Sequence, residues 1–139
     1  MHIKLSLKAL GAGVLLAFIA SALLSLLAPY YLIPIHGLIA RGSAPRSLLY
    51  HPLTIAVMLL TCILEVGVPG YLAAWIANRR FILHSLIVAV VYIALAIAIS
   101  WDGIAPTSYL LVVTAWSLLV ATMAGYLRQW QRRGSGEAL

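Results

Sequence analysis

The stretch LTIAVMLLTCILEVGVPGYLAAWIA, residues 53–77, decides the fold. It is predominantly apolar, its one charged residue is Glu65, and it contains one helix breaker, Pro69. An α-helix needs about 20 consecutive, mostly apolar residues to cross the hydrocarbon core of a bilayer. We therefore expect a transmembrane helix at about residues 53–77.

Runs of similar length and character occupy about residues 5–28, 81–100 and 108–127. Of the 139 residues, 64% are hydrophobic and 9% are charged, whereas soluble domains are about a quarter charged. The mean hydropathy is +1.07. The sequence predicts an all-α integral membrane protein: one four-helix bundle over residues 1–133, followed by a flexible polar tail at 134–139.

The basic residues predict the orientation of this bundle. The formal net charge is +6, and four crossings would put seven of the nine basic residues on one side of the membrane: Lys4, Lys8, Arg79, Arg80, Arg128, Arg132 and Arg133. The positive-inside rule then places both termini in the cytoplasm. This distribution explains the positive charge without a nucleic-acid site. The first run is too long for the core of a signal peptide, so we expect a retained helix.

The longest connection, residues 29–52, mixes aromatic, aliphatic and basic side chains. Segments of this composition tend to lie along the membrane interface, so we interpret it as an interfacial outer loop. The alternative is a docking loop that uses His36, Arg41, Arg46 and His51.

Small residues recur at spacings of three and four on the predicted helices. Such stripes let helix backbones approach closely in lipid. The predicted packing residues are Gly13, Ala17, Ser21 and Ser25 in the first helix, Gly67, Gly70 and Ala74 in the second, and Ser117, Ala121 and Gly125 in the fourth.

Glu65 lies about 12 residues, or about 18 Å, from the outer end of its helix, near the middle of a hydrocarbon layer about 30 Å thick. A charge at this depth costs about 2.5–3.5 kcal/mol on insertion scales, so we expect the uncharged acid. Pro69 lacks the amide hydrogen that would bond the carbonyl of Glu65. Glu65 and Pro69 together therefore predict a kink in the second helix. At this polar point, neighbouring helices must supply hydrogen bonds to the Glu65 carboxyl group and to its free carbonyl.

Depth matching predicts which side chains meet this polar point. The hydroxyl groups at similar depth belong to Ser21, Tyr92, Thr114 and Ser117. One interpretation is a proton or cation site, because ionisable residues inside the membrane are functional candidates by default. The other is an uncharged glutamic acid that fixes the helix register through a hydrogen bond. The sequence leaves both open.

Motifs for catalysis or cofactor binding are not found. The single cysteine, Cys62, rules out an internal disulfide. The four histidines lack the spacing of metal ligands, and neither a phosphate-binding loop nor a dinucleotide fingerprint occurs. We expect no enzyme activity, no metal and no cofactor.

The segment GVPGYLAAWIANRRFILHSLIVAVVY, residues 67–92, resembles a pattern in uncharacterised small four-helix inner-membrane proteins of bacteria. The pattern is a glycine-rich second helix, a short basic turn and a histidine near the start of the third helix, and it is matched by Gly70, Tyr71, Ala73, Ala74, Ile76, Ala77 and His84. The resemblance implies a bacterial four-helix protein and transfers no catalytic residue. LEVGVPGY, residues 64–71, also resembles the glutamate-containing stretch of the small multidrug-resistance exporters, although theirs lies in the first helix and this one in the second.

We therefore expect a multi-pass protein of the bacterial inner membrane that acts as a non-catalytic accessory or scaffold subunit of a larger complex. Its partners would be the lipid bilayer and either another membrane protein or copies of itself. The alternative is an oligomeric, proton-coupled small transporter or channel that uses Glu65 at the bilayer midplane.

Overall fold

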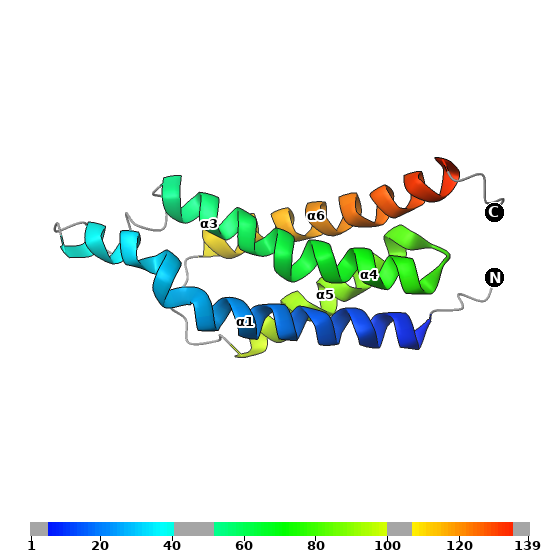
Figure 1. Ribbon diagram of the computed structural model, residues 1–139, viewed down its shortest axis with the longest axis horizontal. Coiled ribbons are helices and arrows are strands. Elements are labelled where there is room, and N and C mark those ends of the chain that lie inside the picture. The colour runs from blue at the N-terminus through cyan, green and yellow to red at the C-terminus, as the bar shows by residue number, and fades with distance from the viewer. Residues whose placement is uncertain (1–5, 41–51, 100–106, 135–139) are drawn as a thin grey trace.

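The computed structural model describes residues 6–40, 52–99 and 107–134, and the regular structure in these ranges is helical (Figure 1). The elements are α1 (Leu7–Ala40), α3 (Pro52–Cys62), the π-helical turn η1 (Ile63–Gly67), α4 (Val68–Ala77), α5 (Phe81–Ile99) and α6 (Thr107–Gly134). Four helical stretches are long and apolar enough to cross a membrane: Leu7–Leu27, Pro52–Ala77, Phe81–Ala98 and Leu110–Gly134.

The first and last helices are longer than the sequence predicts. α1 continues through Pro29 and Pro34 to Ala40, so the helix extends into the segment expected to be the outer loop, although its candidate membrane span ends at Leu27. Each proline removes only one backbone hydrogen bond, and helices of membrane proteins tolerate that loss. α6 continues past residue 127 to Gly134, since Arg and Gln are good helix formers.

The predicted docking residues fall largely outside the described part of the chain. Arg41, Arg46 and His51 lie outside the described residues, as do residues 135–139 of the predicted tail. His36 belongs to α1, but the position of its side chain is not described.

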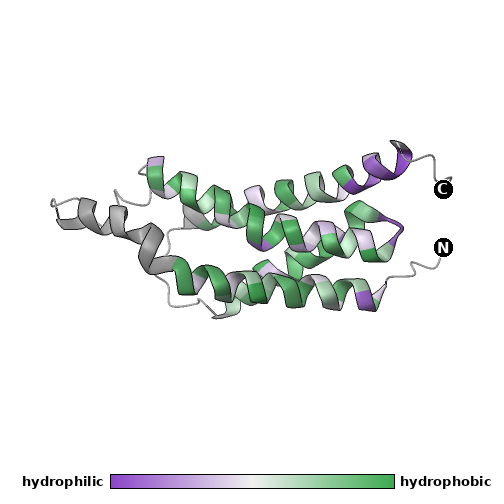
Figure 2. Cartoon of the chain, viewed as in Figure 1, coloured by the Kyte–Doolittle hydropathy of each residue, from purple (hydrophilic) through white to green (hydrophobic). Residues whose placement is uncertain are grey.

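Helix α4 lies between α1 and α6 (Figure 1) and also packs against α5. The interior between these helices is built from small side chains, and the fully buried alanines are Ala9, Ala17, Ala73, Ala74, Ala89 and Ala121. Many large apolar side chains are exposed, Leu15, Leu111 and Met123 among them, and the helices in Figure 2 are coloured mostly green, for hydrophobic residues. Small residues inside and large ones outside are typical of helices that pack in lipid.

Glycines mark the closest helix contacts. A Cβ atom at Gly13 would lie 2.8 Å from Val88 Cγ2 and 2.9 Å from Ala73 Cβ, so α1 approaches both α4 and α5 there. At Gly125 of α6, a Cβ would lie only 2.6 Å from the Cα atom of Ile82 in α5. These backbones pack at distances that no larger residue allows.

The predicted stripe on α1 stops short of Ser25. Gly13 and Ala17 are buried and Ser21 is half-buried, but Ser25 is exposed. The hydroxyl of Ser25 donates to the Ser21 carbonyl at 2.8 Å. Because this bond is made within the helix, Ser25 needs no neighbouring helix, and its assignment to the packing stripe is corrected.

Side-chain contacts hold one end of the helices together. Asn78 and Arg80, in the turn between α4 and α5, have positive φ angles of 51° and 47°. Arg132 of α6 donates to the Asn78 carbonyl, and its guanidinium carbon lies 5.7 Å from the centre of the Phe81 ring. The start of α5 and the ends of α4 and α6 therefore meet at this hydrophilic end, purple in Figure 2.

Candidate functional site

Glu65 lies within the π-helical turn η1, where the Val68 N–H donates to the carbonyl of Ile63, five residues earlier. Pro69 follows shortly after. A proline ring clashes with the carbonyl four residues before it, and the wider π turn relieves this crowding. The irregularity that the sequence places at Glu65 and Pro69 thus takes the form of a π turn, a feature found frequently at functional sites.

The carboxyl group of Glu65 is hydrogen-bonded to Tyr92 of α5. The Tyr92 hydroxyl donates to Glu65 Oε2 at 2.8 Å, and the Ser21 hydroxyl oxygen of α1 lies 3.4 Å from that of Tyr92. A hydroxyl has one hydrogen to donate, so Ser21 is the donor in the second contact whenever Tyr92 donates to Glu65. The result is a hydrogen-bonded chain from α1 through α5 to η1.

Phe18 of α1 holds the Tyr92 ring in place. The two rings meet edge to face, with centroids 6.4 Å apart and an interplanar angle of 72°, an arrangement that aromatic pairs prefer. Glu65, Tyr92 and Ser21 are all half-buried. The carboxyl group is therefore held by a neutral hydroxyl, and the residue that carries it is only half-buried.

Not all of the predicted partners reach the carboxyl group. Tyr92 binds it directly and Ser21 reaches it through Tyr92. Ser117 instead donates to Cys62 Sγ at 3.8 Å, and both of those residues are buried. Thr114 lies on the same helix, α6, whose contacts with the second span include Cys62 and Gly67. In the described part of the chain, Thr114 and Ser117 therefore make no hydrogen bond to Glu65.

Ser85 of α5 makes a buried interhelical contact that the sequence analysis missed. Its hydroxyl donates to the Ala121 carbonyl of α6 at 2.6 Å, and a Cβ atom at Gly70 of α4 would collide with the same hydroxyl oxygen. Ser85 thus joins α5 to α6 at a point where α4 also approaches. No side-chain pattern could have indicated this bond, because its acceptor is a backbone carbonyl.

His84 is also fully buried. Its Nε2 accepts a hydrogen bond from the Ser6 backbone N–H at 3.1 Å, just before α1 begins. Its Nδ1 lies 3.1 Å from the Arg80 carbonyl, which requires the hydrogen to be on Nδ1. The neutral ring thereby ties the start of α1 to the turn that precedes α5.

No protein-family model, curated protein or solved structure matches the chain. The resemblance to small bacterial inner-membrane proteins therefore stays a prediction. The function has to be inferred from the geometry of the helices and from the polar groups between them.

Proposed function

We propose that this protein is a non-catalytic accessory or scaffold subunit of a larger complex in the bacterial inner membrane. The observation that supports this function most is that polar side chains within the spans bond to neighbouring helices of the same chain. Glu65 is bonded to Tyr92, Ser85 to the Ala121 carbonyl, and Ser117 to Cys62. Such bonds give the helices a defined register.

The outer faces favour the same proposal. Large apolar side chains such as Leu15, Leu111 and Met123 are more than 60% exposed. In a membrane these faces are available to lipid or to the helices of another protein. A rigid set of helices with apolar outer faces fits a subunit that assembles with other membrane proteins.

In this proposal the helices form a four-helix bundle with both termini on the cytoplasmic side. The charge distribution supports that orientation. Lys8, Arg79, Arg80 and Arg133 are exposed near the starts or ends of their helices, and basic residues are in excess on the cytoplasmic side of membrane proteins.

Purification of the full chain in a mild detergent tests the accessory role. We expect a second membrane protein to copurify at a fixed stoichiometric ratio. The Glu65→Gln variant should retain that partner, because the glutamine amide oxygen can still accept from Tyr92. A lone monomer obtained in several mild detergents would contradict the proposal.

A second candidate function is a proton-coupled transporter or channel, assembled from several copies around Glu65. It is favoured by a specific observation: a π turn, a half-buried carboxyl group and two hydroxyl groups in a hydrogen-bonded chain occur together. A carboxyl group can hold a proton within the membrane, and hydroxyl groups can relay it.

Proteoliposomes with an imposed pH gradient test this candidate. Proton flux, or the flux of a coupled solute, should be lost in Glu65→Gln. It should persist in Ser117→Ala, which changes a buried hydroxyl that contacts Cys62 instead. Equal flux in the wild type and Glu65→Gln would eliminate the transport function without affecting the copurification result.

A further inference from the structure

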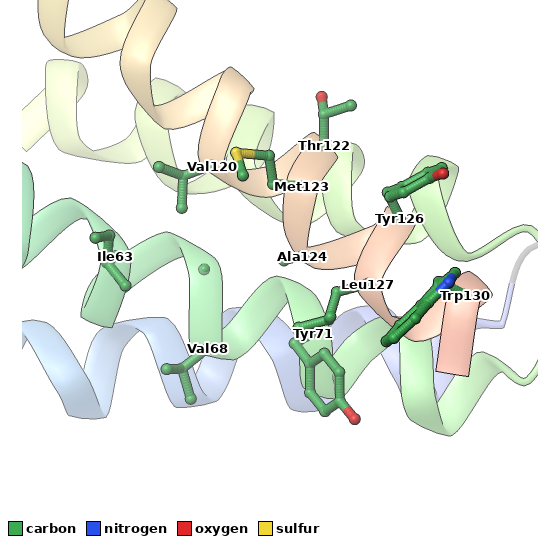
Figure 3. Close-up of a pocket in the computed structure, with 11 residues that line it drawn as sticks. Ile63, Val68, Tyr71, Val120, Thr122, Met123, Ala124, Tyr126, Leu127 and Trp130 are labelled. Carbon is green, nitrogen blue, oxygen red and sulfur yellow. The ribbon is translucent and has the colours of Figure 1, made fainter. Parts of the chain in front are cut away.

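An apolar groove runs along the outer surface between the second span and α6 (Figure 3). Its volume is about 790 Å³. Ile63 and Val68 lie on one wall, and Met123, Leu127 and Trp130 of α6 lie on the other. Both walls belong to helical stretches that are long and apolar enough to cross a membrane.

A close helix contact forms part of this groove. Gly67 of η1 lines it together with Val120 of α6, and a Cβ at Gly67 would lie 2.9 Å from Val120 Cγ1. The backbone of the second span therefore packs directly against the Val120 side chain of α6 at this level. The larger side chains around that point form the walls of the groove.

Two of the three hydroxyl groups in the lining, those of Thr122 and Tyr71, are already bonded within the protein, and the third belongs to the exposed Tyr126. Thr122 donates to the Leu118 carbonyl at 2.8 Å, and Tyr71 donates to Gln131 Oε1 at 2.6 Å. What the walls offer an occupant is therefore mainly apolar contact. A hydrocarbon chain meets that condition fully, because it has no polar group to satisfy.

The volume also favours a slender occupant. It falls within the range of about 300–1,000 Å³ that small-molecule sites occupy. A transmembrane helix about 10 Å across would fill the same volume within about two turns, although crossing the membrane takes about 20 residues. One acyl chain fits the groove better than one helix does.

Cations lie at one end of the groove. Its residues on α6 end at Trp130, and Arg132 and Arg133 follow two and three residues later. On the other side, α4 ends at Ala77 and is followed by Asn78 and Arg79. Arg79 and Arg133 are exposed, and Trp130 is an aromatic residue of the kind found at the headgroup level. An apolar groove with a cationic end complements a molecule with a hydrocarbon chain and an anionic head.

We propose that this groove binds an anionic phospholipid, with an acyl chain along Val68, Met123 and Leu127 and the phosphate near Arg79 and Arg133. Basic residues beside a membrane surface attract anionic lipid. Here the apolar groove adds a position for one chain. The proposal is independent of Glu65 and of the accessory role, because neither the carboxyl group nor a protein partner contributes to the groove.

Native mass spectrometry of the full chain in a mild detergent tests the lipid site. The probes are phosphatidylglycerol and phosphatidylcholine with identical acyl chains. We expect phosphatidylglycerol to be retained preferentially. In the Arg79→Gln/Arg133→Gln double variant its affinity should fall about 30-fold, because each cation near the surface contributes about fivefold to association.

Matched controls separate a specific site from general attraction. Lys8→Gln removes an exposed cation from α1, which packs against α4 and α5 rather than along the groove, and it should change the affinity for phosphatidylglycerol less than twofold. Val68→Trp fills the groove and should weaken the binding of both lipids. Leu15→Trp places the same bulk on α1 at a position 62% exposed and should leave lipid binding unchanged.

Three results would overturn the proposal. The first is equal affinity for the two lipids, and the second is an effect of Lys8→Gln as large as that of the arginine double variant. The third is a Val68→Trp variant that dissociates a dimer without altering lipid binding, since a second copy would then occupy the groove. If Val68→Trp does not fold, the arginine variants still decide the outcome, because their changes lie at exposed positions.

Discussion

The Tyr92 hydroxyl lies 2.8 Å from Glu65 Oε2 and joins the π-helical turn of the second span to α5. Phe18 of α1 packs edge to face on the same tyrosine ring, so this contact involves a third helix. In an apolar span no water replaces a lost hydrogen-bond partner. The Glu65–Tyr92 bond should therefore contribute measurably to stability.

Tyr92→Phe tests that contribution. The change removes the hydroxyl but keeps the ring against Phe18, so the expected loss in the free energy of unfolding is about 0.6–1.7 kcal/mol, the range for interhelical hydrogen bonds in membranes. Unfolding in mixed detergent micelles measures it. Tyr126→Phe, at a position 59% exposed on α6, is the matched control and should have little effect. Equal stability of the two variants would show that the bond contributes nothing.

Two glycines on α1 provide a direct test of helix packing. Gly13→Ala places a Cβ 2.8 Å from Val88 Cγ2 and 3.2 Å from the Pro69 carbonyl oxygen, whereas nothing lies within 4 Å of a Cβ at Gly11. Overpacking of this kind costs about 1–3 kcal/mol. Gly13→Ala should therefore lower the thermal unfolding temperature in detergent, and Gly11→Ala should leave it unchanged or raise it. A similar shift of the unfolding temperature in both variants would show that α1 does not pack closely against α4 and α5 at Gly13.

Ser85→Ala removes a hydroxyl that bonds across helices, and Thr122→Ala removes one that bonds within its own helix. The Ser85 hydroxyl lies 2.6 Å from the Ala121 carbonyl, and that of Thr122 lies 2.8 Å from the Leu118 carbonyl. Interhelical hydrogen bonds in membranes are worth about 0.6 kcal/mol on average and at most about 1.7 kcal/mol. Ser85→Ala should lose stability within this range, measured by the same unfolding assay. A loss at least as large in Thr122→Ala would contradict the assignment of Ser85 as an interhelical contact.

Composition and hydropathy predict the membrane helices because hydrocarbon demands long apolar runs, and the structure has four stretches of the required kind. Counting residues along the helices also identified Tyr92 as a partner of Glu65, since depth depends only on the 1.5 Å rise per residue. Depth says nothing about which face of a helix a side chain occupies. For that reason the count could not separate Tyr92, which bonds Glu65, from Ser117, which bonds Cys62.

Other features depend on tertiary packing. The presence of Pro69 predicted an irregular second helix. Whether the irregularity is a π turn or a simple bend depends on how the neighbouring helices pack. The first helix was expected to end at about residue 28, yet α1 continues to Ala40. The hydrogen bonds of His84 were not predicted because they go to the backbone of Ser6 and Arg80, and backbone groups leave no signature in the sequence.

The buried His84 should hold the start of α1 in place. Its Nε2 accepts from the Ser6 N–H at 3.1 Å, and the Ser6 carbonyl accepts from the Leu10 N–H at 3.0 Å. His84→Leu keeps the site apolar but leaves the Ser6 N–H without an acceptor, so the first turn of α1 should fray. Amide hydrogen exchange should become faster at residues 6–10 and stay unchanged at residues 85–92 of α5. Lys8→Gln changes an exposed side chain in the same turn and should not alter exchange there. Unchanged protection at Ser6 in His84→Leu would show that packing of α1 against α4 and α5, and not the histidine, holds its first turn.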